Sequence, residues 1–317
     1  QNSIISRTDY DAMSGGRITT YENVGMNREC ILEQAKQHDS FYLYEEAIIR
    51  KNTEQLKTDF PGVTFLYSVK CNPYPEVLRC VLNQGFGVDA ASLAECVMGQ
   101  KAGLGKDMVI FSAPGKTMAD IRGGLGISTL VADSAAEVER IQEAAAEQGV
   151  VAEIGLRVNP DFTYTADTGV ASKFGIDEQL IYDSMKSWKK LPNIRIVGLH
   201  AHLKSQELSE EALARLVEKY DETGHPALCE PLFSGARAFP ISTLREGNPE
   251  TVTITGNLCT AADIIAEDIT LPRLAEGDGI VIGNAGAYAA TLSPFAFSSL
   301  ERPKEFLLKE TGDLEGV

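Results

Sequence analysis

The chain has 317 residues, enough for one large domain or two ordinary ones, and its 44% hydrophobic and 23% charged residues are typical of a soluble globular protein. Its formal net charge of −16 argues against nucleic acid or an anionic membrane as a partner, because both bind basic surfaces. Local binding of a small molecule's phosphate stays open, since it uses backbone N–H groups and hydroxyls.

The cysteines and the apolar runs indicate the compartment. None of the six cysteines forms a C-x-x-C pair, which favours reduced thiols over a disulfide framework. They are Cys30, Cys71, Cys80, Cys96, Cys229 and Cys259. The first residues lack the apolar core of a signal peptide, and no apolar run is long enough to cross a membrane. We therefore expect a cytoplasmic protein, and no motif predicts a metal site.

Short apolar runs alternate with amphipathic stretches from about residue 60, which predicts a parallel sheet covered by helices or a β/α (TIM-type) barrel. The expected strands are 64–70, 87–92, 108–113, 128–133, 153–159 and 196–202. The clearest helix is 134–148, for which Asp133 and Ser134 are candidate N-cap residues and Gly149 is the stop signal. These six β/α units are two short of the eight that close a barrel, so the barrel lacks its last two strands in this sequence.

The pattern changes in the last third of the chain. From about Ala227 onward, β-branched runs separated by turn residues predict a mostly antiparallel β domain. We expect residues 40–222 to form the barrel domain and residues 227–317 the β domain. Whether a strand from residues 1–39 joins the β domain is left open.

Polar side chains stand at the carboxyl ends of four expected strands. Lys70 ends the first strand, Asp89 follows the second, and Arg157 lies near the end of the fifth. His202 ends the sixth and is followed by Ser205. Active sites of β/α barrels form at this end. A confined lysine there can lose its proton and attack an aldehyde, although a single strand-end lysine is more often a solvated one.

Seven motifs along the chain resemble those of one enzyme family. YSVKCNP, FGVDAASLAE, RVNP, SKFGI and LHAHLKS are similar, in this order, to barrel motifs of the fold type III (alanine-racemase-type) pyridoxal-phosphate-dependent decarboxylases. Diaminopimelate and ornithine decarboxylases are members of that family. GNLCTAAD (256–263) and NAGAY (284–288) resemble the active-site motifs of its β domain. Each motif alone is weak, but the set covers about residues 40–308 in the right order.

The resemblance implies how the cofactor, pyridoxal 5'-phosphate, is held. Lys70 would carry it as a Schiff base, and His202 would stack on its pyridine ring. Ser205 and Tyr288 would bind its phosphate. His202 has an ordinary alternative as a hydrogen-bonded core histidine, and His200, two residues earlier, receives no firm role.

The resemblance also assigns the residues that support the reaction. Asp89, Glu95 and Arg157 would surround the cofactor on the side of the lysine. Cys259 would reach across the interface of a homodimer with shared active sites and protonate the α-carbon after carbon dioxide leaves. Cys259 alone would more often be a small buried residue. An amino-acid racemase of the same fold is a weaker alternative, because racemases usually place a tyrosine where this chain offers the cysteine.

Two motifs of that family are missing: a glycine-rich strand end that wraps the phosphate and a strand end with an acidic partner for the pyridine nitrogen. The E-P pair at Glu230 continues as L-F and does not supply that partner. A block is therefore absent near residues 206–215. Either the sequence omits it, which predicts a break or gap between about Gln206 and Ala214, or a natural deletion has left a non-catalytic cofactor-binding relative.

The substrate is an amino acid or an amino-acid conjugate whose side chain stays open. Thr260 follows Cys259, where the diaminopimelate and ornithine enzymes carry an acid that helps to recognise the far end of the substrate. Asp263 matches a second acidic position of the motif, and we expect it to bind the substrate, where it could contact an amine.

Overall fold

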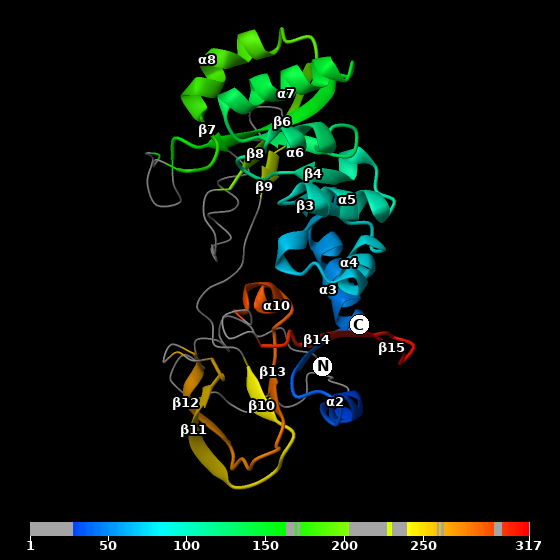
Figure 1. The fold of residues 1–317 in the computed structure, drawn as a ribbon, viewed down its shortest axis with the longest axis vertical. Helices are drawn as coiled ribbons and strands as arrows, with labels where there is room; N and C mark the ends of the chain where they lie inside the picture. Colours follow the sequence, from blue (N-terminus) through cyan, green and yellow to red (C-terminus); the bar gives the residue numbers. More distant parts are fainter. Residues whose placement is uncertain are drawn as a thin grey trace. The chain divides into compact units, whose positions relative to one another are not determined.

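The computed structural model describes residues 28–162, 169, 172–202, 227–229, 240–258, 260, 263–294 and 300–316. The chain divides into two compact units (Figure 1). The parallel-sheet unit is Ile49–Ala236, and the β unit combines Gln1–Ile48 with Arg237–Val317. The gap expected between Gln206 and Ala214 lies outside the described residues.

The parallel-sheet unit is built on consecutive parallel strands in the order β2-β3-β4-β5-β6-β8-β9, with the short β7 beside β6. The strands are β2 (Leu66–Ser68), β3 (Gly87–Ala90), β4 (Val109–Phe111), β5 (Thr129–Ala132), β6 (Ala152–Asn159), β7 (Ile176–Asp177), β8 (Ile194–Ala201) and β9 (Ala227–Cys229). The six expected strands all overlap members of this sheet, so that prediction is confirmed. Within the described ranges, β9 ends the order and does not pair with β2.

One segment is placed differently from the sequence-based expectation. Residues from Ala227 were expected to open the β domain, but Ala227–Cys229 pair in parallel with Leu199–Ala201 of β8 as the last strand in the described order of the sheet. The apolar run alone does not indicate which sheet it joins, and the β-branched runs that follow it favoured the β domain.

Helices alternate with the strands along the chain. They are α3 (Glu46–Asp59), η1 (Val69–Cys71), α4 (Pro75–Leu82), α5 (Leu93–Lys101), η2 (Lys106–Met108), α6 (Met118–Gly124), α7 (Ala135–Glu147) and α8 (Glu178–Trp188). The predicted helix 134–148 is confirmed as α7, with the Ser134 hydroxyl accepting the N–H of Glu137 and Gly149 at φ +66 after its end.

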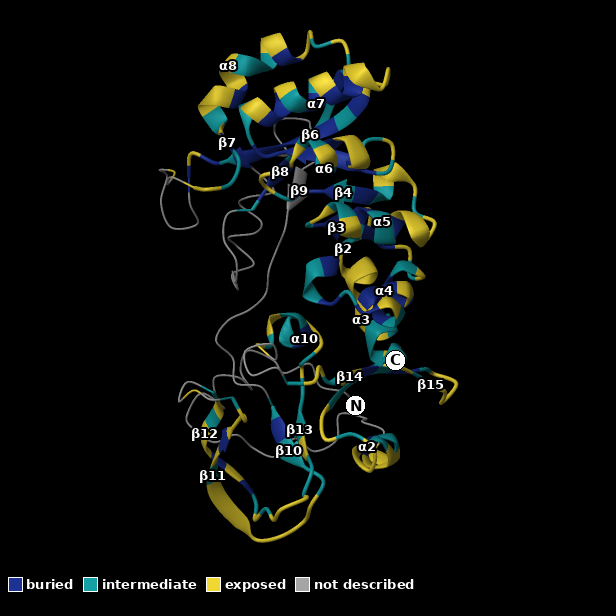
Figure 2. Cartoon of the chain, viewed as in Figure 1, coloured by how far each residue is buried: buried dark blue, intermediate teal, exposed yellow. Residues whose placement is uncertain are grey.

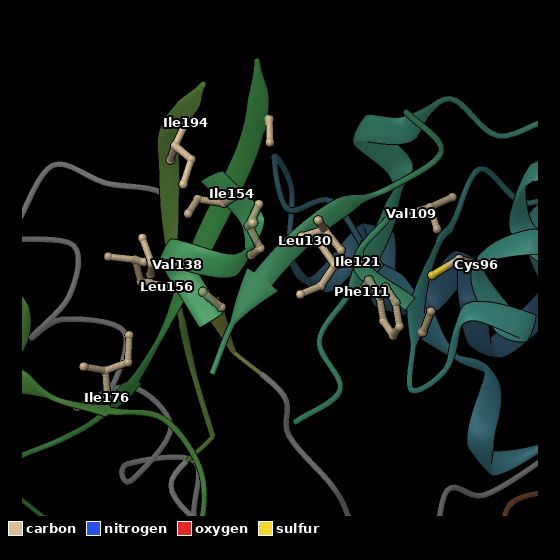
Figure 3. Close-up of a cluster of buried hydrophobic side chains, with 14 of the residues drawn as sticks. Cys96, Val109, Phe111, Ile121, Leu130, Val138, Ile154, Leu156, Ile176 and Ile194 are labelled. Atoms are coloured by element: carbon tan, nitrogen blue, oxygen red, sulfur yellow. The ribbon is translucent and has the colours of Figure 1, made fainter. Parts of the chain in front are cut away.

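The core of this unit lies between the strands and their helices, where the buried residues gather (Figure 2) and their side chains meet (Figure 3). Every position of β3 and β5 is buried, as expected for strands of a parallel sheet that is covered on both faces. Members that are at most 1% exposed include Val88, Val109, Phe111, Ile121, Leu130, Val138, Ile141, Ile154 and Leu156.

The β unit contains mostly antiparallel pairs. Its elements are α2 (Arg28–Ala35), β1 (Phe41–Glu45), β10 (Ile241–Thr243), β11 (Pro249–Thr255), β12 (Ile264–Pro272), β13 (Ile280–Ile282), α10 (Ala289–Leu292), β14 (Lys304–Leu308) and β15 (Leu314–Gly316). Strand β10 pairs with β13, β11 with β12 and β14 with β15, whereas β1 runs parallel to β14. None of the helices in the described ranges is long and apolar enough to span a membrane.

Candidate functional site

The segment after β2 presents Lys70. Strand β2 ends at Ser68, and Lys70 lies two residues later in the 3₁₀ turn η1 rather than on the strand itself. The Tyr67 hydroxyl donates to the carbonyl of Asn72 (2.9 Å), and the side-chain oxygen of Asn72 accepts the N–H of Tyr74 (3.0 Å). These bonds fix the turn before Pro75 starts α4, and they leave about a third of the Lys70 side chain exposed.

A buried carboxylate faces that lysine from the neighbouring strand. Asp89 pairs with Ser68 in the register of β2 and β3, and its Oδ2 lies 4.0 Å from Lys70 Nζ. The Ser68 hydroxyl donates to Oδ2 (3.1 Å) and the Ser112 hydroxyl donates to Oδ1 (2.5 Å). The structure thus brings the predicted pair Lys70 and Asp89 together and adds two serines that the sequence analysis did not name.

Glu95 lies in the first turn of α5, within electrostatic range of the lysine. Its Oε2 accepts the N–H of Ala91 (2.6 Å), while its own N–H donates to the Ser92 hydroxyl (3.2 Å). Burial raises the pKa of the Glu95 carboxyl, and the Ala91 hydrogen bond and the charge of Lys70 oppose that rise. Glu95 is thus a second carboxyl group on the lysine side of the strand ends.

Arg157 is buried near the end of β6, beside His200 in the register of β6 and β8. Its Nη1 lies 3.5 Å from Asp133 Oδ1, and its guanidinium lies over the Phe174 ring at 4.4 Å. The same Asp133 oxygen accepts the N–H of Gly175 (3.2 Å). Through this oxygen Asp133 links Arg157 to the SKFGI segment. Burial raises the pKa of the Asp133 carboxyl, and the charge of Arg157 opposes that rise.

A second buried ion pair connects the segment after β4 with the start of α7, at the same ends of the strands. Lys116, in the segment after β4, lies 2.5 Å from Glu137 Oε1 in the first turn of α7. Its ammonium also donates to the carbonyls of Ala113 (2.6 Å) and Val131 (2.7 Å). Burial lowers the pKa of Lys116 and raises that of Glu137. We interpret the pair as a structural link, because it ties the segment after β4 to the end of β5 and the start of α7.

The other predicted site residues fall into three groups. His202 directly follows β8 and is half-buried. Ser205 and Cys259 lie outside the described residues. Tyr288 and Asp263 belong to the β unit: Tyr288 precedes α10 with a positive φ of 64°, and Asp263 Oδ2 accepts the N–H of Leu258 (2.8 Å) across the turn between β11 and β12.

Both parts of the chain match known protein families. Residues 46–224 match the pyridoxal-binding domain of the pyridoxal-dependent decarboxylases, and residues 220–286 match the C-terminal sheet domain of pyridoxal-dependent decarboxylases.

Individual relatives match over different lengths. The L-glutamyl-[BtrI acyl-carrier protein] decarboxylase of Niallia circulans is 23% identical, with 87% of this chain and 90% of that protein covered. Diaminopimelate decarboxylase of Archaeoglobus fulgidus is 32% identical, but the match covers 56% of this chain and 44% of that enzyme, which is less than half its length.

Solved structures share the fold. Diaminopimelate decarboxylase from Helicobacter pylori, complexed with L-lysine, aligns with a TM-score of 0.77 at 21% identity, covering 90% of this chain and 95% of that chain. The arginine decarboxylase of Paramecium bursaria Chlorella virus, bound to agmatine, aligns with a TM-score of 0.74 at 19% identity, covering 88% of this chain and all of that chain.

Proposed function

The chain belongs to the family of pyridoxal-dependent decarboxylases, and from this premise we propose that Lys70 binds pyridoxal 5'-phosphate covalently for the decarboxylation of an amino acid or amino-acid conjugate. The homologues are amino-acid decarboxylases of this cofactor class, which makes lyase chemistry the activity of the family. The observation that carries the proposal is the position of Lys70 Nζ, 4.0 Å from the buried Asp89 carboxylate at adjacent strand ends.

The residues at this edge fit the cofactor. A partly exposed lysine amine is the group that captures an aldehyde, and charged groups at the same strand ends give a polar cofactor partners that an apolar pocket would lack. When bound, pyridoxal 5'-phosphate supplies an electron sink for the charge left on the α-carbon as carbon dioxide departs. In this scheme Asp89 and Glu95 balance the charge of Lys70, and Asp133 holds Arg157 in place.

Four further residues complete the proposal. His202 contacts the cofactor ring, Ser205 and Tyr288 bind the phosphate, and Cys259 donates the proton to the α-carbon. Support comes from the motifs and from the half-buried position of His202 directly after β8.

An amino-acid conjugate is the substrate class that the observations favour. The carrier-protein decarboxylase matches over 87% of the chain, whereas the Archaeoglobus diaminopimelate enzyme matches over 56%. In addition, Thr260 offers no charge to a distal amine, which counts against a substrate recognised by a free amine at its far end.

Part of the Niallia protein has no counterpart in this chain. The alignment extends over 384 residues, which exceeds the 317 residues of this chain. This is compatible with the proposal, made from the motifs, that residues of the barrel are missing near positions 206–215.

Borohydride trapping tests the lysine. The full chain is incubated with pyridoxal 5'-phosphate and reduced, and the modified peptide is identified by mass spectrometry. We expect the label on Lys70, and we expect Lys70→Ala to lose both the label and carbon dioxide release. Lys106→Ala is the matched control, because Lys106 is an exposed lysine of the same unit that is paired with Glu153.

The outcomes separate the alternatives. Persistent covalent trapping at another lysine in Lys70→Ala would refute the assignment. Trapping on Lys70 without carbon dioxide release from any free amino acid or acyl conjugate would favour the non-catalytic cofactor-binding relative.

A further inference from the structure

Two hydroxyls from the strands on either side of β3 reach one buried carboxylate. Asp89 is 5% exposed on β3, and Ser68 ends β2 directly opposite it in the register. Ser112 follows β4, where its N–H donates to the carbonyl of Ala90 (3.1 Å) and so extends the ladder beyond the strand. Ser112, itself only 5% exposed, is therefore placed by the backbone of the sheet.

The contacts around Asp89 favour its ionised form. A carboxylate that leaves water loses its hydration and needs donors in compensation, and hydrogen bonds to a charged group are among the stronger ones. The Ser112 hydroxyl donates to Oδ1 at 2.5 Å, and the Ser68 hydroxyl donates to Oδ2 at 3.1 Å. Oδ2 is also the oxygen that faces Lys70 Nζ.

We propose that Ser112 is a positioning residue for Lys70: its hydroxyl holds the Asp89 carboxylate ionised and turned toward the lysine, and that carboxylate stabilises the positive charge on the nitrogen. The inference rests on the proposed role of Lys70 as the cofactor lysine, but its electrostatic core concerns side chains of this chain alone. Ser68 supports the same carboxylate through a longer bond.

The first experiment uses the full chain freed of cofactor. Trace labelling with acetic anhydride, followed across pH by mass spectrometry, reports the fraction of unprotonated Lys70. In Ser112→Ala the carboxylate is no longer held in place and can turn away from the ammonium, so the protonated lysine is less favoured. The pH midpoint of labelling should therefore move to lower pH by about one unit, a tenfold change in the proton equilibrium.

Two variants separate positioning from packing. Ser112→Thr keeps the hydroxyl and should return the labelling midpoint close to its wild-type value. Ser128→Ala is the matched control, because Ser128 is also buried and its hydroxyl donates to the carbonyl of Gly124 (2.9 Å), before β5 at the opposite ends of the strands. Equal midpoints in wild type and Ser112→Ala, or equal shifts in Ser112→Ala and Ser128→Ala, overturn the inference.

The second experiment adds pyridoxal 5'-phosphate. The visible absorption band of the lysine-bound cofactor is followed against pH, and its midpoint should shift to lower pH in Ser112→Ala and return in Ser112→Thr. If the wild-type chain is trapped on Lys70 but Ser112→Ala shifts neither midpoint, the inference fails and the proposed function stands. If the wild-type chain binds no cofactor at Lys70 while the labelling midpoint shifts as expected, the proposed function fails and the role of Ser112 toward the lysine charge stands.

Discussion

Gly175 shows how narrowly a single residue is constrained where Arg157 and Asp133 meet. Its φ is +81°, and a Cβ there would lie 2.8 Å from both the backbone nitrogen of Asn159 and the carbonyl carbon of Val158. Such distances cannot be relieved by a side-chain rotation, because the atoms belong to the backbone of β6. The N–H of Gly175 also donates to Asp133, so its position affects the partner of Arg157.

We therefore expect Gly175→Ala to lower the free energy of unfolding by about 2–3 kcal/mol or more, the sum of left-handed backbone strain and overpacking. Urea unfolding monitored by circular dichroism measures the change. Gly149→Ala is the control, because Gly149 has φ +66° but no atom within 4 Å of the position that a Cβ would take. This variant should lower the free energy of unfolding by only about 1–2 kcal/mol. Equal losses in the two variants would contradict the contact argument.

At this scale the sequence predicted the charged residues better than their partners. Lys70, Asp89 and Arg157 could be nominated because strand ends of a β/α barrel collect functional groups. Ser112 could not, because a small hydroxyl after a strand has many ordinary roles and its contact with Asp89 depends on the register of two strands. Asp133 was one of two candidate caps for α7; the structure gives the cap to Ser134, and Asp133 binds Arg157 instead.

Helix α6 illustrates how an element's start can be tested by pH. The Thr117 hydroxyl accepts the N–H of Asp120 (3.1 Å), and the Asp120 carboxylate accepts the N–H of Thr117 (2.9 Å), which forms a capping box. These bonds to Thr117 hold the pKa of Asp120 below its ordinary value of 3.8. A depressed carboxyl pKa gives stability that is present above the ordinary value and is lost as pH falls through the folded-state value.

We expect Asp120→Asn to remove that part of the acid dependence. The wild type should be the more stable of the two near neutral pH, and the difference should shrink as pH falls below about 4, because Asp120 becomes protonated. Urea unfolding of both proteins at a series of pH values measures the difference. A difference that stays constant down to the acid limit of folding would mean that the charge of Asp120 does not stabilise the cap.

Elements were predictable where apolar runs alternate with amphipathic stretches along the chain. The expected strands overlap β2 to β6 and β8, and the expected helix overlaps α7, because this alternation is typical of β/α units. Strands β7 and β9 have two and three residues and lie outside that alternation, so their pairing with β6 and β8 comes from the surrounding sheet. The 3₁₀ turn that carries Lys70 was read as the end of a strand because it directly follows β2.

Across the whole molecule, the residues proposed for the reaction come from both units. Lys70 belongs to the parallel-sheet unit, whereas Cys259 falls within the range of the β unit but outside the described residues. If they act across a two-fold dimer, mixing inactive Lys70→Ala with inactive Cys259→Ala protein should restore about a quarter of the active sites. Steady-state carbon dioxide release after subunit exchange measures the recovery.

The control for this mixture is Lys70→Ala combined with a double variant that carries Lys70→Ala and Cys259→Ala. Every site in that mixture lacks the lysine, so no activity should return. Absence of recovery in the first mixture, with subunit exchange demonstrated by mass-tagged chains, would contradict a shared site.

Motif order predicted the family from the sequence, but the grouping of the chain into units depends on distant pairing. The sequence suggests a linear boundary between residues 222 and 227, which stays a prediction. The structure groups Gln1–Ile48 with Arg237–Val317, and β1 runs alongside β14. A parallel pair separated by most of the chain leaves no local signal, because each strand alone resembles any other short apolar run.

The buried ammonium of Lys116 has a consequence for modularity. In β/α barrels the loops after the strands are commonly treated as exchangeable parts, since the strands carry the stability and the loops carry the chemistry. Here the loop after β4 supplies the cation, while β5 and the start of α7 supply its acceptors at Val131 and Glu137. A chimera that imported only one of these two segments would leave an unpaired charge in the interior, at a cost of about 3–5 kcal/mol. The segment after β4 and the start of α7 therefore have to be exchanged together, and recombination between homologues should preserve them as a pair.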